Sequence, residues 1–117
     1  MPLCQVLTNV PASAAANSSA LLGELSRLLA ARFGKPERWV MTSLQPGLSM
    51  TFGGTDAPTA FVAVKNIGTM KAAETEELSG AICSLVEKAL GVSSERIYIE
   101  FVDAVDHLWG WNGGTFA

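Results

Sequence analysis

The chain has 117 residues, of which 16% are charged and 49% hydrophobic, and its formal net charge is −3. This length fits one domain over residues 1–117, and the composition excludes a disordered chain and a basic nucleic-acid-binding surface. So many apolar residues on a short chain indicate that part of the surface is buried against other subunits.

Apolar periodicity and chain-breaking residues predict two similar halves. The first has a strand at 3–9, a helix from about 13 to 33 and a strand at 39–45. Gly34 and Pro36 end this helix. A short extended piece at 48–52 leads to a strand at 58–67, a helix at about 70–90 closed by Gly91, and a strand at 96–102. The tail, 103–117, is rich in Trp, Gly and Asn and is predicted to form turns and short extended segments.

The two halves repeat at an offset of 57 residues. The offset pairs Asn9 with Asn66, Gly23 with Gly80, Leu25 with Ile82, Leu28 with Leu85 and Gly34 with Gly91, and one residue later Glu37-Arg38 with Glu95-Arg96. Chance similarity of two amphipathic helices is the alternative. The shared helix ends and flanking strands favour a duplicated β-α-β unit, at about 2–45 and 58–102, each with a right-handed parallel crossover.

Two such units predict an α/β (α+β) fold, with a four-stranded mixed sheet and both helices on one face. Alternation along the later strands puts apolar side chains on both faces: Ala60, Val62 and Val64 point one way, Phe61 and Ala63 the other. Tyr98 and Glu100 share the face away from the helices. Because two helices cover only one face, the other should meet another copy of the chain.

The cysteines and the single histidine restrict the possible sites. Cys4 and Cys83 form no Cys-x-x-Cys motif, and we interpret both as reduced thiols of a cytosolic protein. His107 alone cannot supply a zinc site, so we expect no metal. Polar residues interrupt the uncharged first 23 residues, which excludes a signal peptide, and no stretch approaches the length of a membrane span. We therefore expect a cytoplasmic protein.

The start, Met1-Pro2, is the feature that most suggests chemistry. One histidine leaves no Ser-His-Asp or Cys-His arrangement. Aminopeptidases remove an initiator Met before a small residue such as Pro, and removal would give Pro2 a free secondary amine. Burial or a nearby cation would lower the pKa of that amine from about 8 toward neutrality, which suits a general base. The alternative is that Pro is merely a common second residue.

Several short motifs together resemble one family. They are Met1-Pro2, Thr8-Asn9-Val10-Pro11, Gly34-Lys35-Pro36, Phe52-Gly53-Gly54, Ile67-Gly68, Arg96-Ile97-Tyr98-Ile99, Gly110-Trp111-Asn112 and Thr115-Phe116. Over its whole length the chain resembles the macrophage migration inhibitory factor (MIF) family of the tautomerase superfamily. The resemblance implies a homotrimer that catalyses, without a cofactor, the keto–enol tautomerisation of phenylpyruvate- and hydroxyphenylpyruvate-type α-keto acids and of dopachrome derivatives.

The resemblance also implies roles for individual residues. Pro2 would be the proton shuttle, Lys35 would receive the substrate carboxylate, and the backbone amide of Ile67 would contact substrate. Tyr98 would line the pocket from the adjacent subunit. The rest of the expected substrate-binding set is Leu3, Trp39, Lys65, Asn66, Glu100, Trp109, Trp111 and Phe116.

Departures from the family pattern limit what can be transferred. Glu100 stands where mammalian members have a substrate-contacting Asn, and its charge would oppose an anionic substrate, so we expect low activity. Trp39 replaces a Tyr, and Thr59 and Val62 replace the mammalian Cys-x-x-Cys, so no thiol–disulfide activity is expected. A trimeric interaction or signalling protein with a vestigial pocket is the alternative function, and export without a signal peptide is compatible with the sequence.

Overall fold

A computed structural model of the chain describes residues 1–16 and 18–117. In chain order its elements are β1 (Leu3–Thr8), the 3-10 turn η1 (Ala12–Ala14), α1 (Ser18–Phe33), η2 (Glu37–Trp39), β2 (Met41–Gln45), β3 (Ala60–Ile67), α2 (Ala72–Leu90), η3 (Ser94–Arg96), β4 (Ile97–Ala104), η4 (Asp106–Leu108), β5 (Gly110–Trp111) and β6 (Gly114–Thr115).

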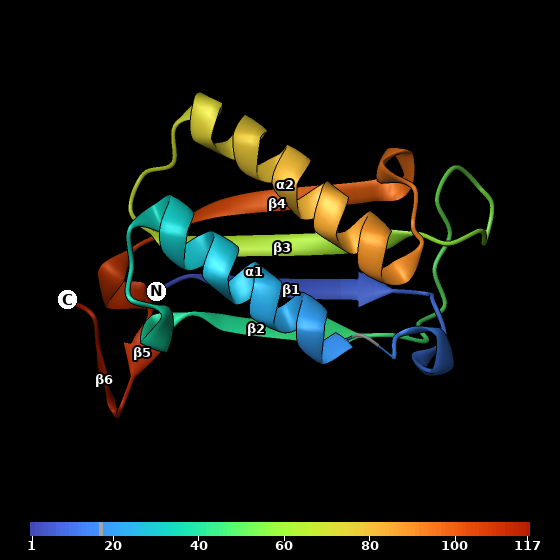
Figure 1. The fold of residues 1–117 in the computed structure, drawn as a ribbon. Helices are drawn as coiled ribbons and strands as arrows, with labels where there is room; N and C mark the ends of the chain where they lie inside the picture. The colour runs from blue at the N-terminus through green and yellow to red at the C-terminus, as the bar shows by residue number, and fades with distance from the viewer. Residues whose placement is uncertain (17) are drawn as a thin grey trace.

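The four long strands form one mixed sheet in the order β2-β1-β3-β4. β1 runs parallel to β2 and β3 parallel to β4, while the central pair β1–β3 is antiparallel. Figure 1 shows both helices side by side over one face of this sheet. The predicted pair of β-α-β units and the mixed sheet are therefore confirmed.

The core lies between the helices and the covered sheet face. The fully or nearly fully buried helix residues are Leu21, Leu25 and Leu29 of α1 and Leu78, Ile82, Val86 and Leu90 of α2. They meet Cys4, Val6, Val62 and Val64 of the central strands. Both helices are therefore amphipathic, as the apolar periodicity predicts, and both cysteines are free thiols. Burial raises the pKa of Cys4 to about 12, so this thiol stays protonated.

We expect Leu25→Ala to lower the free energy of unfolding by about 2–5 kcal/mol, because Leu25 is 0% exposed and its removal leaves a cavity. Denaturant titration followed by circular dichroism measures the change. Leu22→Ala, on the half-buried flank of the same helix, is the matched control and should cost clearly less. Equal losses in the two variants would show that the core is not centred where the structure puts it.

One local prediction is wrong. The first helix begins at Ser18 rather than near residue 13: residues 12–14 form a 3-10 turn, and the N–H of Ala14 donates to the Pro11 carbonyl at 2.9 Å. Ala15 is buried against the core and fixes the chain there; Asn17 lies outside the described residues. The predicted extended piece at 48–52 joins no strand of the four-stranded sheet, and within it Phe52 makes a bridge to Thr55.

The uncovered sheet face is apolar only in part. Strand alternation places on it Leu3, Leu7, Met41, Phe61, Ala63, Tyr98 and Val102, together with Gln5, Ser43, Lys65 and Glu100. The sequence prediction weighed mainly the apolar residues of the later strands. Those strands also carry Lys65 and Glu100, and β1 and β2 add Gln5 and Ser43. Met41 and Tyr98 are 66% and 65% exposed, so large apolar side chains do face outward here.

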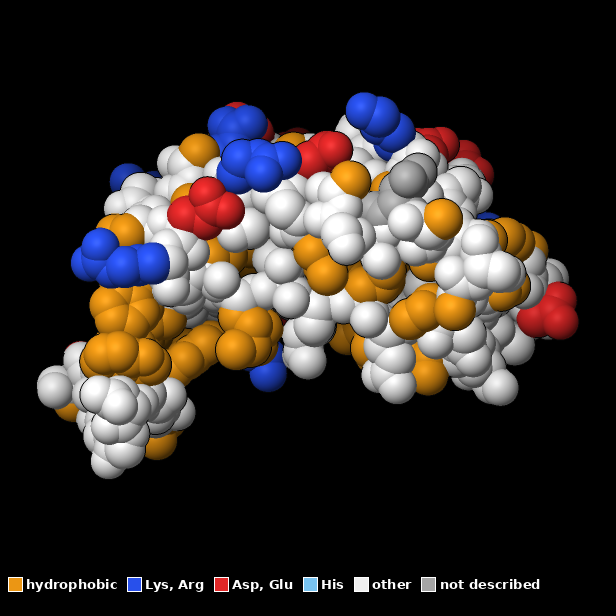
Figure 2. All heavy atoms as spheres, turned by 60° about the horizontal axis from the view of Figure 1, so that its bottom comes forward, with side chains coloured by type: hydrophobic (Ala, Val, Ile, Leu, Met, Phe, Trp, Pro, Cys, Tyr) orange, Lys and Arg blue, Asp and Glu red, His pale blue; other side chains and the backbone are white. Residues whose placement is uncertain are grey.

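The charged side chains concentrate on the helical side. In Figure 2 most of the blue and red lies along the top, over the helices, while orange and white make up most of the projecting lower-left end and of the lower edge. Within residues 1–16 and 18–117, no helix is long and apolar enough to cross a membrane. The same part of the chain holds no cluster of three His, Cys, Asp or Glu side chains that could bind a metal ion.

Candidate active site at the N-terminal end of the sheet

The start of β1, the end of β3 and the end of α1 meet at one end of the sheet, where η2 and the β5–β6 hairpin also lie (Figure 1). Pro2 is buried there. Its carbonyl accepts the N–H of Met41 at 3.0 Å, which extends the β1–β2 ladder by one residue. The chain start is therefore held in the sheet, and its nitrogen has a defined place.

The end of α1 positions Lys35. Gly34 takes a left-handed conformation with φ +61°, and the N–H of Lys35 donates back to the Ala30 carbonyl at 3.0 Å, which is a Schellman-type helix end. The chain then turns toward β3, and Lys35 Nζ donates to the Ile67 carbonyl at 3.2 Å. The expected neighbourhood of Lys35 and Ile67 is thus present.

The chain's amino group lies close to this lysine. Burial, followed by the charge of Lys35 and a hydrogen bond with it, lowers the pKa of the Met1 amine from 8.0 to about 6. An amine in this place is therefore largely unprotonated at neutral pH. That electrostatic environment suits a basic nitrogen at the start of the chain.

Aromatic side chains from η2 and the tail form a cluster beside this end. Trp39 meets Trp111 edge-on with ring centroids 4.7 Å apart, and Phe116 lies 5.9 Å from both. The Arg38 guanidinium stands 5.4 Å from the centre of the Trp39 ring. Trp109 is half-buried, and its carbonyl accepts the N–H of Phe116 at 3.2 Å, which closes the hairpin. The cluster offers an apolar, aromatic surface.

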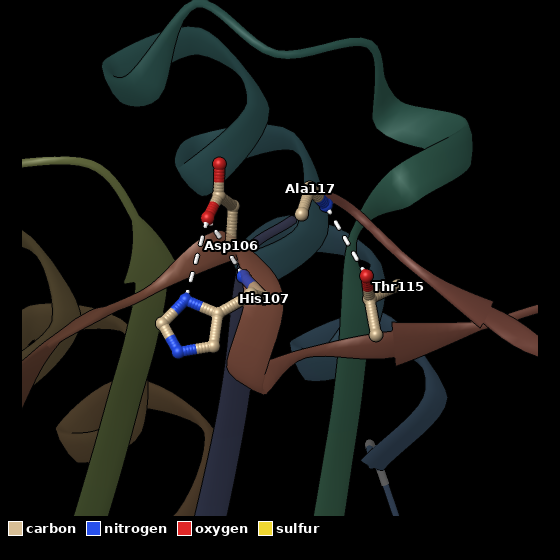
Figure 3. Close-up of polar contacts among 4 residues, drawn as sticks. All are labelled: Asp106, His107, Thr115 and Ala117. Carbon is tan, nitrogen blue, oxygen red and sulfur yellow. Dashed lines mark hydrogen bonds and ion pairs between the residues drawn. The ribbon is translucent and has the colours of Figure 1, made fainter.

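Figure 3 shows the tail around His107 and the chain end. The N–H of His107 donates to Asp106 Oδ1 at 2.7 Å, and its Nδ1 lies 3.9 Å from the same oxygen. Ala117 N–H donates to Thr115 Oγ1 at 3.4 Å. The His107 side chain is mostly exposed, which gives it no part in the cluster.

The end of β3 divides its side chains between the two faces. Lys65 pairs directly with Leu3 on the uncovered face. Asn66 points toward the helices, where the residue is 5% exposed and its Oδ1 has no hydrogen-bond partner among the described residues. Because Lys65 pairs with Leu3, Asn66 lies opposite Pro2, and Ile67 follows one position further along β3.

Tyr98 and Glu100 are not brought to this end within one chain. Tyr98 lies opposite Phe61 and Glu100 opposite Ala63. At about 3.3 Å per residue, these positions are roughly 16 Å and 10 Å along β3 from Asn66. Tyr98 packs on Phe52 with ring centroids 4.8 Å apart. Both residues do lie on the uncovered face, as predicted.

The far end of the sheet contains the larger hollows. One of about 490 Å³ is lined by Asn9, Leu48, Ser49, Met50, Thr51 and Asp56. The other, of about 410 Å³, is lined by Met50, Thr51, Phe52, Gly53, Thr59, Ala60, Phe61 and Tyr98. The second is mainly apolar and has Tyr98 in its wall.

Two arginines were not identified as important from the sequence. Arg96 donates to the carbonyls of Phe52, Thr55, Ala57 and Pro58 at 2.9–3.2 Å and so holds the 52–58 loop. Arg38, its partner in the sequence repeat, stands at the aromatic cluster instead. The sequence repeat could have drawn attention to both arginines, because it aligns Arg38 with Arg96.

Comparisons with known proteins agree with this architecture. The family model for macrophage migration inhibitory factor (MIF) matches residues 1–117. The MIF homologue of Prochlorococcus marinus has a similar structure, with a TM-score of 0.93 and 48% identity over 98% of this chain and 99% of that one. The MIF sequences of Meriones unguiculatus and Mus musculus are 38% and 36% identical, over the full length of both chains. The chain therefore belongs to the MIF family.

Proposed function

We propose that this MIF-family chain is a keto–enol tautomerase for phenylpyruvate- and hydroxyphenylpyruvate-type α-keto acids, with dopachrome derivatives as further substrates. The observation that carries the proposal is the buried start of the chain. Pro2 lies at a sheet end where burial and Lys35 lower the pKa of an amine. Once Met1 is removed, Pro2 would carry such an amine.

Each step of the reaction needs a group that this end of the sheet offers. Enolisation requires a base beside the carbon acid. The unprotonated Pro2 nitrogen would take the proton from C3 and deliver it to the keto oxygen at C2, and in the reverse direction it would carry the enol proton back to C3. Lys35 would bind the substrate carboxylate through a charge-assisted hydrogen bond. The cluster of Trp39, Trp111 and Phe116 would hold the aryl ring. The reaction moves one proton and needs no cofactor.

We further propose that the site is completed in a homotrimer. Tyr98 and Glu100 lie too far from Pro2 to act within one chain, yet both are exposed on the face that no helix covers. The hollow of about 410 Å³ beside Tyr98 is a suitable place for the N-terminal end of a neighbouring copy. Tyr98 and Glu100 of one chain would then face Pro2 of another.

The test is the disappearance of phenylenolpyruvate absorbance with N-terminally processed protein, together with native mass spectrometry. We expect a rate well above the uncatalysed one and a trimeric mass. A trimer without measurable tautomerase activity would favour the alternative, an interaction or signalling protein with a vestigial pocket. A fully active monomer would overturn the composite site.

Glu100→Asn should raise kcat/KM for phenylenolpyruvate, because the carboxylate repels the substrate anion. Glu100 is exposed and makes no ion pair among the described residues. For unit charges about 6–8 Å apart the repulsion is about 0.5–3 kcal/mol between bulk water and a protein surface, so we expect a gain of roughly 2- to 100-fold. The gain should shrink as salt is added.

The matched control for this measurement is Glu95→Gln, which removes an exposed carboxylate from η3. It should leave kcat/KM unchanged. If Glu100→Asn gives no gain at low salt, the carboxylate does not face the substrate, and its electrostatic role is refuted.

A further inference from the structure

Asn66 presents a buried hydrogen-bond acceptor that is not used. The residue is 5% exposed, and its Oδ1 has no partner among the described residues. A buried carbonyl oxygen without a donor is costly, and most such groups in proteins are paired. A donor is therefore expected from the strand that lies beside Asn66.

The antiparallel β1–β3 ladder has two equivalent ends. Thr8 pairs with Ala60 at one end and Leu3 with Lys65 at the other. One step beyond each end, Asn9 lies opposite Thr59, and Asn66 lies opposite Pro2. The 57-residue repeat relates these two outer pairs to each other. It aligns Asn9 of the first pair with Asn66 of the second, and Thr59 of the first pair with Pro2 of the second.

At the first end the outer pair is hydrogen-bonded. The backbone N–H of Thr59 donates to Asn9 Oδ1 at 2.9 Å, and Asn9 Nδ2 donates to the carbonyls of Asp56 and Ala57. At the second end the corresponding donor would be the nitrogen of Pro2. Within an intact chain that nitrogen carries no hydrogen, which accounts for the unpartnered Oδ1 of Asn66.

We propose that removal of Met1 creates the missing donor, so that the Pro2 amine donates its N–H to Asn66 Oδ1. A neutral secondary amine has one N–H and one lone pair. With the N–H held by Asn66, the lone pair is fixed in direction and stays free for a substrate. Asn66 is then a positioning residue for the base, rather than the direct substrate contact that the family resemblance implies.

The catalytic consequence rests on the proposed function, whereas the contact itself does not. Asn66 Oδ1 also stabilises the protonated form of the Pro2 amine. It therefore raises the pKa of this amine, whereas the nearby Lys35 lowers it. The charged residues on the elements beside Pro2 are Lys35 after α1, Glu37 and Arg38 on η2, Lys65 on β3 and Asp103, which lies opposite Asn66 on β4.

The first test is a stability cycle of four proteins, in which the native chain and the Asn66→Leu variant are each prepared with Met1 present and with Met1 removed. Mass spectrometry defines each N-terminus, and the thermal midpoint is the readout. In the processed chain Asn66→Leu should lower the midpoint, because it removes the acceptor for the new N–H. In the chain that keeps Met1 the same change should leave the midpoint unchanged or raise it, because it deletes an unpaired buried oxygen.

Asn9→Leu is the matched control, because the Thr59 N–H is present whether or not Met1 is removed. It should lower the midpoint equally in both backgrounds. An equal shift for Asn66→Leu in both backgrounds would overturn the proposal. Asn66→Asp serves as the second variant, since it keeps an acceptor oxygen at the site.

The second test follows the Pro2 amine directly, by the ¹⁵N chemical shift of proline-labelled, processed protein across a pH titration. Asn66→Leu should lower the pKa of this amine and Asn66→Asp should raise it, while Asn9→Asp should leave it unchanged. An unmoved pKa in both Asn66 variants would overturn the contact. If the pKa falls in Asn66→Leu and rises in Asn66→Asp, but the protein has no tautomerase activity, the contact is supported and the proposed function is refuted.

Discussion

A chain that keeps Met1 should be about 10²- to 10⁴-fold less active toward phenylenolpyruvate than the processed chain, which is the contribution expected of a well-placed general base. With Met1 present, the Pro2 nitrogen is an amide and has no basic lone pair. The Met1 amine, although largely unprotonated near neutral pH, is displaced by one residue, about 3.8 Å. A displacement of that size removes most of the benefit of positioning.

The measurement is the initial rate for two preparations whose N-termini are defined by intact-mass spectrometry. Pro2→Ala in the processed chain is a useful control, because it restores an amine at the correct residue but without the ring that limits its rotation. The rate of this variant should lie between those of the processed chain and the chain that keeps Met1. Equal rates for the processed and Met1-retaining chains would remove Pro2 from the mechanism and favour the interaction protein.

The fold was predictable because its signals are local and repeated. The apolar stripe of each helix, the left-handed glycines at 34 and 91 and the alternation in the strands each specify one element, and the repeat specifies how they combine. The start of α1 was not predictable, because Ser13 is a suitable N-cap and the Ala residues after it suit a helix equally well. Packing of Ala15 into the core decides the matter.

The residues of the candidate site come from distant parts of the sequence, so only the family resemblance could group them beforehand. Lys35 lies beside the amine at the chain start and donates to the Ile67 carbonyl. Trp39 likewise contacts Trp111 and Phe116 across a long stretch of sequence, and no periodicity indicates such contacts. The unpartnered oxygen of Asn66 required the strand register, because only the pairing of β1 with β3 places it opposite a residue without an N–H.

Lys35→Met should lower kcat/KM for phenylenolpyruvate by about 10- to 150-fold, which corresponds to the 1.5–3 kcal/mol of a hydrogen bond to a charged group. The loss comes from the substrate carboxylate, which would have no cationic partner. Lys35→Arg keeps the charge and should lose less. An uncharged ester of the substrate provides a second comparison, because the Lys35→Met change should hardly affect its rate.

The same variant should also move the pH profile in a defined direction. Burial first, and then Lys35, lower the pKa of an amine at the chain start. Removing the lysine removes one of these causes, so the pKa of the Pro2 amine should rise. The base acts unprotonated, so the acid limb of kcat/KM should shift to higher pH in Lys35→Met, while Lys35→Arg should keep the original limb. A lower rate with an unmoved limb would mean that Lys35 binds substrate without adjusting the base.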